Sequence, residues 1–163
     1  MKRKLIPLFL VFLFACSSGP DYSPRKINFD RDVCAMCKMG LTDQKYSVQA
    51  INKDGEVLWF DDIGCLVEMM ETDKWKKFTR GDSVKIWVGD VETGNWIDAT
   101  KAYYRFGDTT PMGYGYGALQ NKTADSLFTF EETIKRIKEG KTMRESFLKQ
   151  HKMMNRGDNG KSK

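Results

Sequence analysis

The chain has 163 residues and a formal net charge of +5 at pH 7, which suits one compact domain or two small subdomains packed together. The positive charge is concentrated at the two ends, and the residues between them carry nearly balanced charge. The sequence therefore offers no basic face for nucleic acid, and it excludes a nucleic-acid-binding function. Its single histidine, His151, lies near the C-terminus, which excludes a Ser/His/Asp catalytic triad.

The first 15 residues have the pattern of a bacterial lipoprotein signal peptide. A basic start is followed by an apolar run over residues 5–14, too short to span a bilayer, and then by Ala15 and Cys16. We expect residues 1–15 to be removed, Cys16 to be lipidated, and residues 16–29 to form a flexible tether. This signal predicts a membrane-anchored protein of the bacterial cell envelope, in the outer membrane facing the periplasm.

The next stretch, about residues 30–92, predicts a β-β-α-β unit. Residues 45–51 alternate as a strand does, Asp54-Gly55 predicts a hairpin turn, and residues 56–60 return as a second strand. Asp61 or Asp62 is placed to cap one helix, which we expect to end near Gly81. Residues 83–88 predict a third strand.

A second unit is expected over about residues 93–150. Residues 94–106 are rich in strand-forming side chains, and residues 118–132 are weakly similar to residues 50–62: strand, turn, strand, then an acidic helix start. Helices are predicted at 131–138 and 144–153. The fold class is therefore α+β, with two tandem β-β-α-β-like repeats packed together over residues 30–150. Residues 151–163 predict a basic disordered tail.

A cluster of sulfur side chains stands near the start of the first unit. Cys34, Met36, Cys37 and Met39 place two thiols and two thioethers within six residues. Thiolate and thioether together are soft ligands, and this combination selects Cu(I) over harder metals. The cluster and the signal peptide together predict copper handling outside the cytoplasm.

Other uses of a C-x-x-C pair fit less well. A thioredoxin-like dithiol needs a buried strand before it, and residues 28–33 do not predict one. A c-type haem site needs histidine at position 38, which is Lys38. A structural zinc site needs four ligands, whereas Cys34, Cys37 and Cys65 supply three.

Cu(I) needs only two or three soft ligands. Cys37 and Met39 are two residues apart and lie on the same side of an extended segment. Met112 could supply a third ligand, because it precedes the second predicted unit much as Met39 precedes the first. Cys34 completes the candidate metal-ligand set. Once Cys16 carries lipid, three thiols remain, and an odd number does not form a complete disulfide framework.

Three segments resemble the nitrous oxide reductase accessory lipoproteins, the NosL family. Residues 34–40 resemble its C-x-x-C-x-M segment, residues 59–65 its F-D-D-x-x-C segment, and residues 110–115 its T-P-M-G-x-G segment. The order of the three motifs is kept over about residues 30–135. Lys38 departs from the small residue often found in the first motif, and the basic tail has no counterpart that we can place.

The resemblance implies a membrane-anchored Cu(I) chaperone without catalytic activity. Such a chaperone delivers copper for the Cu–S centre of nitrous oxide reductase and works with a membrane ABC-type assembly complex. It further implies two β-β-α-β repeats related to organomercurial lyase. Carried over by position, Cys37, Met39 and Met112 are the implied copper ligands.

One alternative is a thiol-dependent envelope enzyme, either an oxidoreductase or an organometal lyase. It would use Cys37 with Cys34 or Cys65, near an acid such as Asp61 or Asp62. The sequence leaves open the roles of Cys34 and Cys65, the client enzyme, and the function of the basic tail.

Overall fold

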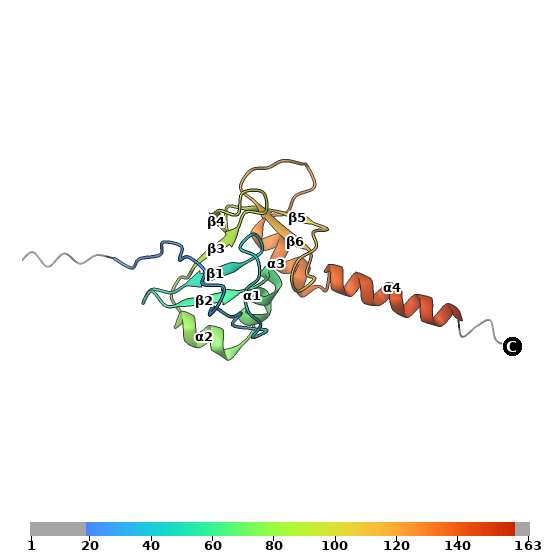
Figure 1. Cartoon of the computed structure of the whole chain (residues 1–163), viewed down its shortest axis with the longest axis horizontal. Coiled ribbons are helices and arrows are strands. Elements are labelled where there is room, and N and C mark those ends of the chain that lie inside the picture. Colours follow the sequence, from blue (N-terminus) through green and yellow to red (C-terminus); the bar gives the residue numbers. More distant parts are fainter. Residues whose placement is uncertain (1–18, 159–163) are drawn as a thin grey trace, which may run out of the picture.

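A computed structural model describes residues 19–158. The predicted signal peptide, the predicted lipidation at Cys16 and the last residues of the tail lie outside this range. The predicted α+β class is confirmed (Figure 1). The elements, in chain order, are β1 Val48–Ile51, β2 Val57–Phe60, α1 Ile63–Met70, α2 Asp73–Thr79, β3 Lys85–Gly89, β4 Trp96–Asp98, β5 Tyr103–Phe106, β6 Tyr116–Leu119, α3 Phe130–Lys138 and α4 Met143–Asp158. No helix in the described range is long and apolar enough to cross a membrane.

The first sheet is antiparallel, with strand order β2-β1-β3-β4. The predicted hairpin is present: β1 and β2 pair from Val48 opposite Phe60 to Ile51 opposite Val57. All four residues of the central strand β1 are buried, since helices and loops cover both of its faces. The helix α1 then packs against α2 and α3.

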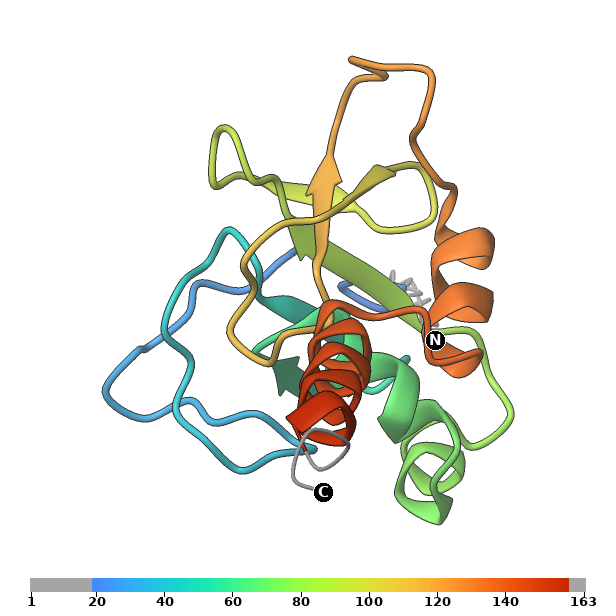
Figure 2. The same ribbon diagram turned by 90° about the vertical axis from the view of Figure 1, so that its right-hand side faces the viewer.

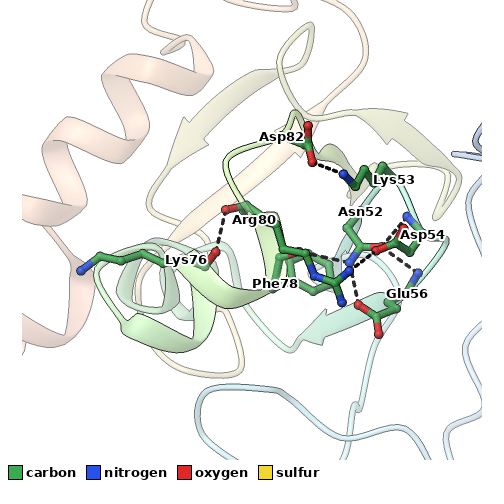
Figure 3. A network of polar contacts seen from close by, with 9 residues as sticks. Asn52, Lys53, Asp54, Glu56, Lys76, Phe78, Arg80 and Asp82 are labelled. Carbon is green, nitrogen blue, oxygen red and sulfur yellow. Dashed lines mark hydrogen bonds and ion pairs between the residues drawn. The ribbon is translucent and has the colours of Figure 1, made fainter.

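A polar network joins the β1–β2 turn to the end of α2 (Figure 3). The side-chain amide of Asn52, which is 2% exposed, donates to the backbone carbonyl of Phe78 at 3.1 Å and to the carboxylate of Glu56 at 2.7 Å. Its amide oxygen accepts from the backbone N–H groups of Asp54 and Glu56. This single buried side chain therefore fixes both the turn and the last turn of the neighbouring helix.

The helix expected to run from residue 63 to about residue 80 is broken into α1 and α2. The break falls at Glu71–Thr72, where Thr72 adopts extended backbone and its hydroxyl accepts from the N–H of Trp75 at 3.2 Å. Thr72 thus caps a new helix, and α2 ends at Arg80 in the left-handed region with φ of 49°. The prediction of one helix was wrong because a threonine inside the pattern acts as a helix start.

The second unit differs from its prediction. The strands β5 and β6 form the antiparallel pair, joined by the loop 107–115, and Phe128 bridges to Tyr104 instead of pairing back onto β6. The hairpin predicted over residues 118–128 is therefore wrong. The strand β4, assigned to the second unit at its boundary near residue 93, belongs to the first sheet because it pairs with β3. In the described chain α3 is followed by helix α4 and not by a closing strand.

The segment expected to be a flexible tether is partly docked on the first sheet. The carbonyl of Tyr22 accepts from the indole N–H of Trp87 at 2.8 Å. The side-chain amide of Gln49 brackets Arg25, accepting from its N–H at 2.7 Å and donating to its carbonyl at 3.1 Å. Ile27 is buried in the core. The ordered domain thus begins several residues before the expected boundary at residue 30.

The C-terminal boundary also differs from its prediction. The helix predicted over residues 144–153 is longer, since α4 runs from Met143 to Asp158 and includes residues 151–158 of the expected disordered tail. Figure 1 shows this helix extending away from the two sheets.

We predict that Asn52→Ala lowers the free energy of unfolding by about 2–3 kcal/mol, because it leaves the buried Phe78 carbonyl and two turn N–H groups without partners. Urea unfolding followed by circular dichroism measures the change. The matched control is Lys53→Ala, which removes the half-exposed ion pair with Asp82. We expect this control to cost less than about 1 kcal/mol. Equal losses for the two variants would contradict the role assigned to Asn52.

Candidate metal centre

Three thiols from two distant segments gather at one place. The Sγ atoms of Cys34, Cys37 and Cys65 all lie within 4.8 Å of one another. Cys34 and Cys65 are buried, whereas Cys37 is partly exposed. A metal ion can therefore approach the cluster from the side of Cys37.

The turn that carries Cys34 and Cys37 is fixed by backbone hydrogen bonds. The N–H of Lys38 donates to the carbonyl of Cys34 at 3.0 Å, and the N–H of Cys34 donates to the carbonyl of Met39 at 2.8 Å. The N–H of Ala35 donates to the carbonyl of Trp59 in β2 at 2.7 Å. These bonds close the turn and attach it to the edge of the first sheet.

Cys65 reaches the cluster because α1 starts immediately after β2. Asp62 is the N-cap of α1, and its carboxylate accepts from the N–H of Gly64 at 3.1 Å. Cys65 is therefore in the first turn of the helix, where the positive end of the helix dipole favours nearby negative charge. The start of the helix thus favours negative charge on a thiolate next to Cys65, such as that of Cys34.

The three thiols do not ionise alike. A hydrogen bond from the Cys65 thiol lowers the pKa of Cys34 to about 5, and the backbone N–H groups of Asp61, Cys37 and Met36 act in the same direction. Donation of that hydrogen bond raises the pKa of Cys65, and burial raises the pKa of Cys37. Of the three cysteines, Cys34 is therefore the one whose thiolate form the surroundings favour.

Two lysines lie beside the cluster. Lys38 has a φ of 67°, which is unusual for a residue with a side chain, and its ammonium donates to the carbonyl of Ala35 at 2.5 Å. Partial burial lowers the pKa of Lys74, in α2, and the nearby charge of Lys38 lowers it further. The positive charges of these lysines oppose the negative charge that thiolate ligands bring to a metal.

The loop with the second candidate methionine is bound to the same helix start. The buried carboxylate of Asp62 accepts from the Thr110 hydroxyl and from the N–H of Met112 at 3.3 Å. Within this loop Gly113 and Gly115 have φ of 72° and 84°, a region that glycine enters without strain. The two glycines of the T-P-M-G-x-G segment thus allow the loop backbone to adopt this conformation.

Tyr114 holds the loop from its other side. A Cβ at Gly64 would lie 2.0 Å from the Tyr114 ring, so only glycine allows this close approach of α1 to the loop. The Tyr114 hydroxyl donates to Glu68, and the guanidinium of Arg144 donates to both, at 3.1 Å and 3.2 Å. The first turn of α1, the loop and the start of α4 are therefore bound together.

The structure brings together two of the four predicted ligands, Cys34 and Cys37, and adds Cys65. Met39 is 47% exposed two residues after Cys37. Met112 is partly buried in the loop held by Asp62. Both methionines stay predictions as ligands. The sequence did contain a clue that Cys65 belongs to the site. It lies three residues after Asp62, and therefore in the first turn of the helix that Asp62 caps.

The α+β scaffold thus gathers three thiols that could hold a soft metal ion. The chain belongs to the NosL family, whose family model matches residues 26–133. Among solved structures it is similar to the copper chaperone NosL from Shewanella denitrificans, with 18% sequence identity and a TM-score of 0.55. The match covers 69% of this chain and 96% of that chain, and at this identity it shows the fold. No curated protein matches the sequence significantly.

We predict that one thiol of the reduced, metal-free protein ionises at about pH 5, the pKa of Cys34. Because the pKa is lowered, the thiolate is present above this pH and is lost as the pH falls through it. The ultraviolet absorbance of the thiolate, followed during a pH titration, measures the step. Cys34→Ser should remove the step, and Cys65→Ala should move it toward the ordinary thiol value of about 8.5. A titration in which all thiols ionise near that ordinary value would contradict the assignment.

Proposed function

We propose that this protein is a copper chaperone that binds Cu(I) at the thiol cluster and passes it on without catalysing a reaction. The observation that carries the proposal is the arrangement of the thiols: two buried and one, Cys37, partly exposed within 4.8 Å of both. Membership of the NosL family supports it, as does the fold shared with a protein described as a copper chaperone.

The exposed side of the cluster suits transfer by ligand exchange. An incoming thiol or thioether from a partner displaces one protein ligand at a time, which requires a low coordination number and an accessible ligand. Cys37 and Met39 meet this requirement, since both are reachable from solvent. We propose Cys37, Met39, Met112 and Cys34 as the ligands, with Cys65 as a further thiol that supports Cys34.

The proposed cellular role includes an anchor in the membrane and a client enzyme that receives the copper. We propose that lipidated Cys16 anchors the chain in the bacterial envelope, facing the periplasm. There it delivers copper for the Cu–S centre of nitrous oxide reductase through a membrane ABC-type assembly complex. Family membership supports this client and partner.

The alternative of an organometal lyase or thiol oxidoreductase needs an acid that is free to move a proton near the thiols. Asp62 accepts hydrogen bonds from Gly64, Thr110 and Met112. Asp61 accepts from the N–H and the hydroxyl of Thr42. Both carboxylates are buried and hold loops in place. This use of the two acids favours the chaperone over the enzyme.

We predict that Cys37→Ser abolishes tight Cu(I) binding, because a hydroxyl is a hard and poor substitute for thiolate on Cu(I). Anaerobic titration against a competing Cu(I) chelator measures the affinity. Met39→Leu and Met112→Leu should each weaken binding while keeping side-chain volume. Met70→Leu, on the partly buried side of α1, is the matched control and should bind as the parent does. An unchanged affinity of the Cys37→Ser protein would show that the ligand set is wrong.

We further predict that Cys16→Ser releases the protein into the soluble envelope fraction without changing its affinity for Cu(I). A lipid anchor confines the search for an integral-membrane partner and raises the effective concentration. The defect should therefore appear as reduced copper loading of the client in cells. Fractionation after a high-salt wash, together with Cu(I) titration, tests both parts. If the washed variant stays in the membrane, the signal peptide is the anchor; if purified variant loses Cu(I), Cys16 is itself a ligand.

A further inference from the structure

The helix α4 contacts the body of the protein mainly through its first turn. The N–H of Arg144 donates to the carbonyl of Gly113 at 2.8 Å, and the N–H of Met143 donates to that of Tyr114 at 3.3 Å. Beyond this turn the helix extends away from the two sheets, as Figure 1 shows, and Figure 2 views it nearly along its axis. The matched family region ends at residue 133, so neither this helix nor its use follows from the family model.

Large apolar side chains are exposed along this helix. Phe147 is 66% exposed, Leu148 59%, and Met153 and Met154 65% each. Met143, Phe147 and Met154 follow the spacing that places side chains on one face of a helix. An exposed row of this kind needs a covering surface, because exposed apolar patches on soluble proteins are normally small.

The charged residues of α4 indicate which kind of surface would cover its apolar face. Lys149 and Lys152 are exposed, and helical spacing places them on the side opposite Phe147 and Met154. Arg156, Lys161 and Lys163 follow in the sequence, and Asp158 is the only acid after Glu145. The end of the chain is therefore basic and amphipathic. A helix with one apolar face and positive charges on its other side complements a bilayer with negatively charged headgroups.

We propose that α4 binds an anionic lipid surface and lies in the plane of the membrane. Phe147 and Met154 insert at the boundary between headgroups and acyl chains. Lys149 and Lys152 stay at the level of the lipid phosphates, which long flexible lysine side chains can reach. This contact is separate from the predicted lipid at Cys16, and it is independent of the proposed copper function.

The test uses a chain that begins at Ser17, which lacks the predicted lipid site and contains every described residue. Its binding to vesicles of phosphatidylcholine alone is compared with binding to vesicles that also contain phosphatidylglycerol, by co-sedimentation at low and high salt. We expect binding to the anionic vesicles at low salt, weaker binding at high salt, and about tenfold or more weaker binding to the neutral vesicles.

Two variants separate the apolar and charged contributions. Phe147→Ser and the double variant Lys149→Glu/Lys152→Glu should each lower anionic vesicle binding by about tenfold or more. Both alter exposed side chains, so circular dichroism and Cu(I) affinity should match the parent. The matched control is Lys76→Glu/Lys77→Glu in α2, which makes the same change of net charge at exposed positions of another helix and should bind as the parent does.

Several outcomes would overturn the proposal. They are absence of binding to the anionic vesicles, equal binding to neutral vesicles, and equal loss in the α2 control. Formation of a dimer through α4, detected as a doubled mass in sedimentation equilibrium that Phe147→Ser abolishes, would assign the apolar face to a second copy instead.

Discussion

The buried carboxylate of Asp62 is the interaction on which the rest of the site depends. It caps α1, and the same side chain accepts from Thr110 and from the N–H of Met112. Burial raises the pKa of this carboxyl, while the hydrogen bonds from Thr110, Gly64 and Met112 act against that rise. One group thus fixes the first turn of a helix, which carries Cys65, and a loop about fifty residues away. Together with Tyr114, it holds α1 and the loop that contains Met112 in fixed positions relative to each other.

The three thiols of the cluster differ in their exposure to solvent, which suits a site that both binds and releases a metal ion. Two thiols are inside the protein and one is at the surface, so the protein can bind a soft ion without enclosing it. Lys38 and Lys74 add positive charge beside the thiols. Because opposite charges attract, these lysines favour the thiolate form of a neighbouring cysteine, which is the form that binds a metal.

The sequence predicted those parts of the fold that local patterns determine. The Asp54-Gly55 turn and the alternation around it predicted the first hairpin. The extended segment expected from Cys37 to Met39 was wrong, because Lys38 between them adopts a φ of 67° and its N–H closes a turn onto the carbonyl of Cys34. Local patterns failed where long-range contacts decide. Thr72 is compatible with a helix interior until its hydroxyl caps α2, and the pairing of Phe128 with Tyr104 joins residues 24 positions apart, beyond any local pattern. The docking of Tyr22 on Trp87 is of the same kind.

The attachment of α4 has a mechanical consequence. The acceptors for its first N–H groups are the carbonyls of Gly113 and Tyr114, the two residues that follow Met112. Arg144 and Glu68 clamp Tyr114 between the start of α4 and the middle of α1. The orientation of α4 and the backbone path of the loop that contains Met112 are therefore coupled. A partner that changes the orientation of the outer end of α4, a helix of 16 residues, would therefore also shift the loop bound to the first turn of that helix.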